Sequence, residues 1–156
     1  MPKKPIKITL KPVTDEQLFN RYLLNLETAF EKIFGYAPNP GDERIRSNAA
    51  KIICDNQITA SEIIHIFNSV IFFKTGINGI VLTEKGVYVN DVNCPVNFSV
   101  LYSNIDSVYS VILEHITKPT IVILKMKDGT EYSINFTKEE PEKLVQFLNY
   151  AKNKKY

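Results

Sequence analysis

The chain has 156 residues, of which 44% are hydrophobic and 23% are charged, and its formal net charge is +2 at pH 7. This length suits one domain, or a small domain with a helical extension, and the composition is that of a globular rather than a disordered protein. A net charge this small does not indicate nucleic-acid binding, so we expect no nucleic-acid partner.

Residues 1–13 predict an extended or flexible leader, because Pro5 and Pro12 limit regular strand pairing. Lysines gather in this leader and again at the other end of the sequence, where blocks of like charge usually form solvated tails. No apolar stretch follows the basic start, so we expect no signal peptide. The longest apolar run, Val70–Phe73, is far shorter than the roughly 20 residues that cross a bilayer. We therefore expect a cytoplasmic protein.

Residues 14–73 predict a segment of three helices joined by short turns. The first begins at the capping-box pattern Thr14-Asp-Glu-Gln17 and ends at Gly35, with apolar residues every three or four positions. The second runs from Asp42 to about Asp55. The third opens with a second capping-box pattern, Thr59-Ala-Ser-Glu62, and continues through Ile71. Each helix carries an apolar face, so we expect the three to pack together.

After Gly76 the periodicity becomes that of strands. The runs Ile80–Leu82 and Val87–Val89 flank a short polar segment closed by Gly86, which predicts a β-hairpin. Two more strands are expected over 98–102 and 107–113. The turn Asp128-Gly129 predicts a second hairpin between strands at 120–126 and 131–136. A final helix is expected to begin near Pro141, with a buried stripe formed by Leu144, Phe147, Leu148 and Ala151.

The order of these elements resembles the pleckstrin-homology-like (PH-like) domains of bacteria, and more loosely the GRAM type, from about Phe72 to Lys152. An early strand of that family often reads leucine-threonine-x-x-glycine-hydrophobic-tyrosine, and a later run reads isoleucine-x-tyrosine-x-x-isoleucine-x-x-valine. The matching residues here are Leu82, Thr83, Gly86, Val87 and Tyr88 for the first pattern, and Val100, Tyr102, Ile105 and Val108 for the second.

The resemblance implies an α+β fold in which the three-helix segment precedes a bent antiparallel β-barrel or sheet over residues 74–156, closed by the C-terminal helix. The family usually has seven strands, whereas five or six runs are evident here. A further strand in 92–96 or 71–77 would complete the set. The helices at 14–73 lie outside the family pattern.

The residues that could carry chemistry are few and scattered. His65 is expected to be packed in the third helix, and Glu114 and His115 are strand neighbours that point to opposite faces. Cys54 lies in an apolar run and Cys94 in a loop, and the sequence leaves open a disulfide between them. No metal-ligand spacing or phosphate-binding loop occurs. We expect no enzymatic activity and no cofactor.

Binding is the better-supported prediction. Lys85 in the first hairpin loop and nearby Lys74 are candidates for an anionic lipid, although Glu84 offsets part of their charge. Tyr88, Tyr102 and Tyr109 are core candidates that could instead share an outer face and bind a partner. We predict a non-catalytic module that binds a protein. The alternatives are peripheral binding to anionic membranes and a small immunity or antitoxin-type protein.

Overall fold

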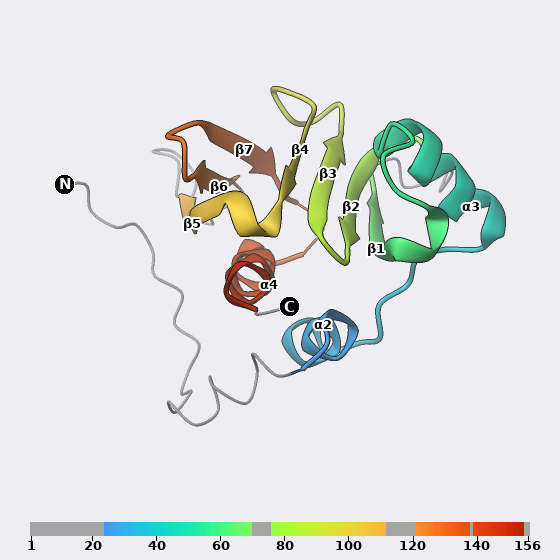
Figure 1. Ribbon diagram of the computed structural model, residues 1–156, viewed down its shortest axis with the longest axis horizontal. Coiled ribbons are helices and arrows are strands. Elements are labelled where there is room, and N and C mark those ends of the chain that lie inside the picture. The colour runs from blue at the N-terminus through green and yellow to red at the C-terminus, as the bar shows by residue number, and fades with distance from the viewer. Residues whose placement is uncertain (1–23, 70–75, 112–120, 138, 155–156) are drawn as a thin grey trace. The chain divides into compact units, whose positions relative to one another are not determined.

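The computed structural model describes residues 24–69, 76–111, 121–137 and 139–154 (Figure 1). These residues belong to two compact units. The first unit joins the described residues up to Ala37 to those from Ser103 onwards, and the second unit is Pro38–Tyr102. Each unit contains one antiparallel sheet and its own helices, so the α+β class is confirmed.

The second unit is built on a four-stranded antiparallel sheet with the order β1-β2-β3-β4. The strands are β1 (Ile63–Asn68), β2 (Gly79–Thr83), β3 (Gly86–Asn90) and β4 (Phe98–Leu101). Before the sheet come α3 (Glu43–Asn48), the π-helix η1 (Ala49–Ile53) and the 3-10 turn η2 (Ala60–Glu62). The predicted first hairpin is confirmed as β2 and β3, with Leu82 opposite Val87 across the turn.

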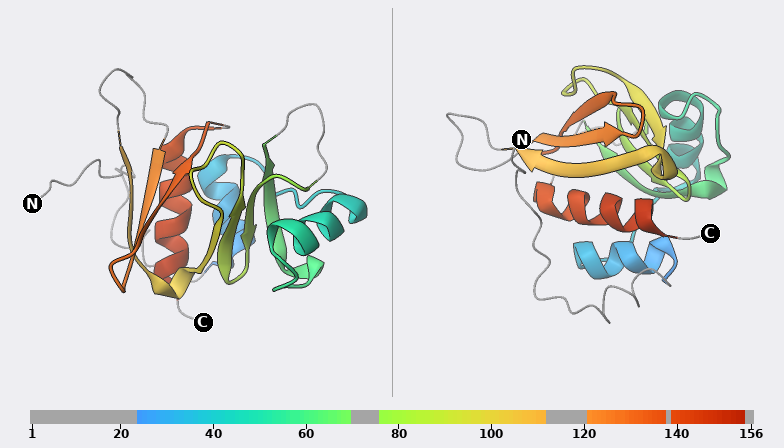
Figure 2. Two further views of the ribbon diagram at one scale, coloured as in Figure 1. Left: turned by 90° about the horizontal axis from the view of Figure 1, so that it is seen from above. Right: turned by 60° about the vertical axis from the view of Figure 1, so that its left-hand side comes forward.

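The first unit combines a three-stranded antiparallel sheet with two helices. Its strands, in the order β5-β6-β7, are β5 (Ile105–Val111), β6 (Ile121–Met126) and β7 (Glu131–Asn135). Its helices are α2 (Leu26–Phe34) and α4 (Pro141–Asn153), and α4 lies between α2 and the strands (Figure 2). The short turn η3 (Tyr102–Asn104) precedes β5. The second predicted hairpin and the C-terminal helix are confirmed, and all four predicted stripe residues of that helix are buried.

The predicted third helix is wrong. The capping box at Thr59 and Glu62 forms, with the Thr59 backbone N–H donating to Glu62 Oε2 at 3.1 Å, but it closes only the three residues of η2. The chain then enters β1, which pairs along its length with β2. The run is rich in β-branched and aromatic side chains and is buried on both faces, so its apolar pattern does not separate a strand from a helix.

The helical arrangement and the barrel also differ from the prediction. Of the first predicted helix, residues 14–23 lie outside the described residues, and the described part begins at the N-cap Asn25. The described strands form two separate sheets, and no closed barrel joins them, because the ladder stops at β4 and resumes with different partners at β5. The predicted leader, 1–13, and the predicted boundary at residue 74 lie outside the described residues and stay predictions.

Candidate functional site

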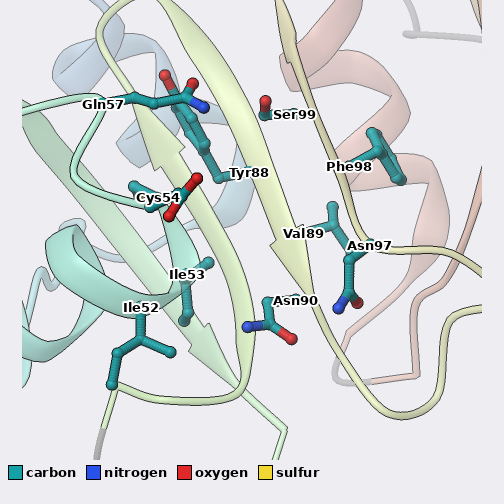
Figure 3. Close-up of a pocket in the computed structure, with 11 residues that line it drawn as sticks. Ile52, Ile53, Cys54, Gln57, Tyr88, Val89, Asn90, Asn97, Phe98 and Ser99 are labelled. Atoms are coloured by element: carbon teal, nitrogen blue, oxygen red, sulfur yellow. The ribbon is translucent and has the colours of Figure 1, made fainter.

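A hollow of about 260 Å³ opens on the second unit between residues 52–57, at the end of η1 and just after it, and the strands β3 and β4 (Figure 3). We call it the β3–β4 hollow. One wall comes from residues 52–57 and the other from 88–90 and 97–99, so distant parts of the sequence meet there. It is lined by Ile52, Ile53, Cys54, Asp55, Gln57, Tyr88, Val89, Asn90, Asn97, Phe98 and Ser99.

The first wall owes its shape to an unusual backbone. The π-helix η1 is wider than an α-helix, and it ends where Asp55 and Asn56 take positive φ values of 53° and 60°. Asp and Asn tolerate this left-handed conformation better than other residues with a Cβ. The backbone N–H of Asn56 donates to Ala50 O at 2.8 Å and holds the turn closed. As a result, Ile52 is 43% exposed at the rim while Cys54 is fully buried.

The second wall follows from the register of β3 and β4. Tyr88 is opposite Ser99 and Val89 is opposite Phe98, and because successive strand residues point to opposite faces, these two pairs lie on different faces of the sheet. Ser99 and Asn97 are exposed, whereas Phe98 and Asn90 are half-buried. This wall therefore offers both apolar surface and hydrogen-bonding groups to anything that enters the hollow.

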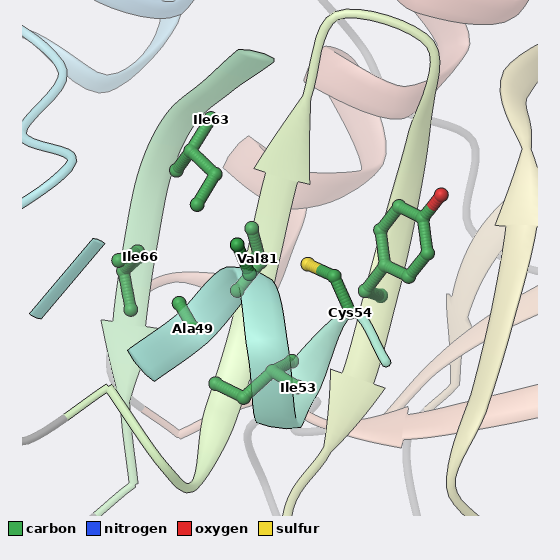
Figure 4. Packing of buried hydrophobic residues seen from close by; sticks show 8 residues of the cluster. Ala49, Ile53, Cys54, Ile63, Ile66 and Val81 are labelled. Carbon is green, nitrogen blue, oxygen red and sulfur yellow. The ribbon is translucent and has the colours of Figure 1, made fainter. Parts of the chain in front are cut away.

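The floor of the hollow belongs to the core of the second unit. Tyr88 and Cys54 pack with the buried side chains of η1, β1 and β2 (Figure 4). The full cluster is Ala49, Ala50, Ile53, Cys54, Ile63, Ile66, Val81 and Tyr88. Because packed interiors resist change, the hollow is a preformed feature of this unit.

The electrostatics of the hollow do not favour nucleophilic or acid–base chemistry. Burial, and secondarily the charge of Glu62, raise the pKa of Cys54 to about 12. Burial is also the main cause that raises the pKa of Tyr88, followed by Cys54 and Glu62. Both groups are protonated at neutral pH, so neither supplies a thiolate or a phenolate. Asp55 is the acidic residue of the lining, and no Lys or Arg is among the described residues that form it.

The structure assigns the predicted binding residues to different units and environments. Tyr88 lines the hollow, but Tyr109 lies half-buried on β5 in the first unit. Tyr102 is 1% exposed, so it cannot contribute to an exposed tyrosine face, and that part of the prediction is corrected. Lys85 is exposed in the turn between β2 and β3, next to Glu84. Lys74 lies outside the described residues.

Tyr102 is buried because it completes the first hairpin turn. Its hydroxyl donates to Thr83 O at 2.7 Å, and its backbone N–H donates to Lys85 O at 2.9 Å. The Thr83 hydroxyl donates to Gly86 O at 2.8 Å and accepts from Gly86 N at 3.0 Å. A Cβ at Gly86 would lie 2.3 Å from Val100 O, so only glycine fits. These residues of the two sequence patterns therefore stabilise the turn.

His65 has a structural environment on β1. It is 6% exposed, its Nδ1 accepts a hydrogen bond from Asn39 N at 2.8 Å, and its ring contacts Phe67 edge to face. Burial lowers the pKa of His65 to about 4, so the ring is neutral at physiological pH. The other predicted pair, Glu114 and His115, lies outside the described residues.

The remaining chemical predictions concern cysteines, metals and membranes. Cys54 is buried and Cys94 is half-buried, and the disulfide that the sequence left open between them is not formed. Within the described ranges, no cluster of three His, Cys, Asp or Glu side chains is arranged to hold a metal ion. In the same residues, no helix has both the length and the apolar character needed to span a membrane.

Sequence reasoning missed most of the lining. Ile52, Asp55, Gln57, Asn90, Asn97 and Ser99 were not predicted as site residues. The one local signal was the pair Asp55-Asn56, which indicated only the end of a helix. Comparison of the chain with known proteins finds no matching family model, no matching curated protein and no matching solved structure, so the PH-like resemblance stays a prediction.

Proposed function

We propose that the chain is a non-catalytic interaction module that binds a protein partner at the β3–β4 hollow. The observation that carries the proposal is the lining itself, which joins an exposed aliphatic side chain to neutral hydrogen-bonding groups around one preformed depression. The scaffold supports it too. The described strands form a sheet of four and a sheet of three, followed by a helix, and this matches the family's seven strands only if β1 is counted, which lies before the segment of the PH-like resemblance.

The size and chemistry of the hollow favour a protein over a small molecule. Drug-sized ligands usually occupy closed pockets of about 300–1,000 Å³, and this hollow is smaller and open. Side-chain amides both donate and accept hydrogen bonds, so Gln57, Asn90 and Asn97 can pair with the peptide groups of a partner. Protein interfaces characteristically combine such polar groups with aromatic and aliphatic contacts, which Tyr88 and Ile52 provide.

The same lining argues against anionic membranes as the ligand of this hollow. Each basic residue near an anionic surface contributes about 1 kcal/mol to membrane binding. The described lining contains none, and Asp55 would be repelled. Peripheral membrane binding elsewhere on the chain, and an immunity or antitoxin role, remain alternatives. The second of these would also be protein binding.

The test compares two equally exposed isoleucines. Ile52 lines the hollow and is 43% exposed, whereas Ile77 is 41% exposed and does not line it. Tagged wild-type protein, Ile52→Arg and Ile77→Arg are used for quantitative affinity capture from source cells after brief cross-linking. We expect at least one protein to be captured equally by wild type and Ile77→Arg and to be lost with Ile52→Arg.

A second variant on the opposite wall strengthens the test. Asn97→Arg changes an exposed side chain of the β3–β4 hollow and should remove the same protein from the captured set. Circular dichroism melting curves confirm that each variant is folded. If every captured protein is retained by both hollow variants, or if no protein is enriched over the tag alone, the proposal is wrong.

A further inference from the structure

We infer that the occupant of the β3–β4 hollow is an extended peptide segment of the partner that carries a lysine or arginine beside an aliphatic residue. This inference rests on the proposed function and specifies its ligand. The cationic side chain would lie against Asp55, and the aliphatic side chain would lie against Ile52.

The charge of the hollow selects a cation. Asp55 is exposed at the rim, and its left-handed backbone, at φ 53°, holds it on the turn that closes the first wall. At the buried end, the charge of Glu62 acts on both Cys54 and Tyr88. Asp55 therefore places negative charge at the rim, and the charge of Glu62 adds a negative potential at the buried end. No described basic side chain of the lining compensates these charges. An entering cation would be attracted, and an entering carboxylate would be repelled.

The exposed side chain of Ile52 favours an aliphatic residue in the ligand. Ile52, which lines the hollow, is 43% exposed. Protein interfaces combine apolar contacts of this kind with hydrogen-bonding groups. Covering Ile52 would remove apolar area from water and stabilise the complex.

The volume of the hollow selects an extended segment over a helix. One turn of α-helix, with a diameter of about 10 Å and a pitch of about 5.4 Å, fills about 400 Å³. The hollow holds about 260 Å³, which is enough for one or two side chains of an extended chain. Successive side chains of such a segment point to opposite sides, so its peptide groups could reach amides on both walls, at Gln57 and at Asn90 or Asn97 (Figure 3).

The test selects random short peptides displayed on phage against the full-length wild-type protein, with counter-selection on Ile52→Arg. We expect enriched peptides to carry Lys or Arg within two positions of Leu, Ile or Val. Their affinities are then measured by fluorescence anisotropy for wild type and Asp55→Asn. Asn is chosen because it tolerates the left-handed backbone of Asp55 and removes only the charge.

We expect Asp55→Asn to weaken the enriched peptides about three- to tenfold at low ionic strength, with a smaller effect in high salt because exposed charges are screened. Glu31→Gln, which removes one charge from an exposed acidic residue of α2, serves as the matched control and should leave the affinity unchanged. Replacing the basic residue of the peptide by Glu should abolish binding to the wild type.

Several outcomes would overturn the inference while leaving the proposed function intact. Acidic or uncharged enriched peptides, affinities equal for wild type and Asp55→Asn, or no enrichment at all would exclude the basic peptide. If a captured protein still depended on Ile52 in those cases, the ligand would be a folded surface. A dimer of the chain itself that is lost on Ile52→Arg in sedimentation would assign the hollow to a second copy instead.

Discussion

At the scale of single residues, identical chemical groups have opposite energetic roles in this chain. The Thr83 hydroxyl is buried and bonds to both backbone groups of Gly86, whereas the Ser110 hydroxyl on β5 is fully buried and has no hydrogen-bond partner among the described residues. A buried hydroxyl stabilises a fold only when it is paired, because burial removes its bonds to water. The Thr83 hydroxyl thus stabilises the hairpin, whereas removing the Ser110 hydroxyl would break no hydrogen bond to the described residues.

We predict that Thr83→Val lowers the free energy of unfolding by about 1–3 kcal/mol, because it leaves the backbone groups of Gly86 with poorer partners while keeping the side-chain shape. Ser110→Ala should leave the free energy of unfolding unchanged or raise it by up to about 1 kcal/mol. Urea denaturation of both variants measures the difference, and Thr83→Ser, which keeps the hydroxyl, is the control. A Ser110→Ala variant as unstable as Thr83→Val would contradict the assignment.

At the scale of elements, the first unit depends on a contact between helices from opposite ends of the sequence. Phe30 and Phe34 of α2 contact Phe147 of α4, with ring centroids 5.9 Å and 6.5 Å from that of Phe147. Polar contacts mark both ends of α2. The Tyr36 hydroxyl donates to Glu139, and Tyr150 both donates to Leu24 O and accepts from Leu24 N, at 2.8 Å and 2.9 Å. Helix α2 therefore covers a face of α4 that would otherwise expose aromatic surface.

Tyr150→Phe should loosen the start of α2 without disrupting the aromatic contacts. Lys154 Nζ also donates to Leu24 O at 2.6 Å, so the carbonyl keeps a partner, whereas Leu24 N loses its acceptor. We expect the free energy of unfolding to fall by about 1–2 kcal/mol. Hydrogen exchange should become faster at residues 24–34. Tyr109→Phe on β5 is the control, and equal exchange at 24–34 in both variants would argue against the role of Tyr150.

At the scale of the whole molecule, stability should depend on pH through His65. The pKa of His65 is about 4 in the folded chain, against an ordinary value of 6.5. Below pH 6.5 the unfolded state takes up a proton that the folded state does not, so the free energy of unfolding falls as pH falls from 6.5 towards 4. Above pH 6.5 the neutral ring binds no proton in either state, and its contribution is complete.

We predict that the wild type loses about 2 kcal/mol of unfolding free energy through His65 between about pH 7.5 and pH 5, since one pKa unit corresponds to about 1.4 kcal/mol. Urea denaturation at both values measures the loss. His65→Gln, although less stable at every pH, should show a pH dependence reduced by about that amount. Equal pH dependence in wild type and His65→Gln would show that His65 is not the group responsible.

Local chemistry explains which elements could be predicted. The Asp128-Gly129 turn has the positive φ that it predicted, 93° at Gly129, and the β2–β3 turn is closed by Thr83 and Gly86 within the same short segment. The buried stripe of helix α4 could be predicted because its apolar residues recur at helical spacing within one short segment. Strand β1 was not predicted from the sequence pattern, because it is buried on both faces and so lacks the alternation of apolar and polar residues that marks a strand.

The sequence by itself determined the α+β class, two hairpins, the C-terminal helix and the lack of a recognisable catalytic motif, because each follows from residues close together in the chain. Only the tertiary structure decided that β1 completes the first sheet and that the candidate site is the β3–β4 hollow. That hollow joins residues 52–57 to 88–90 and 97–99, and its polar residues are individually unremarkable. Their significance comes from burial and register, which depend on strand pairing between distant segments.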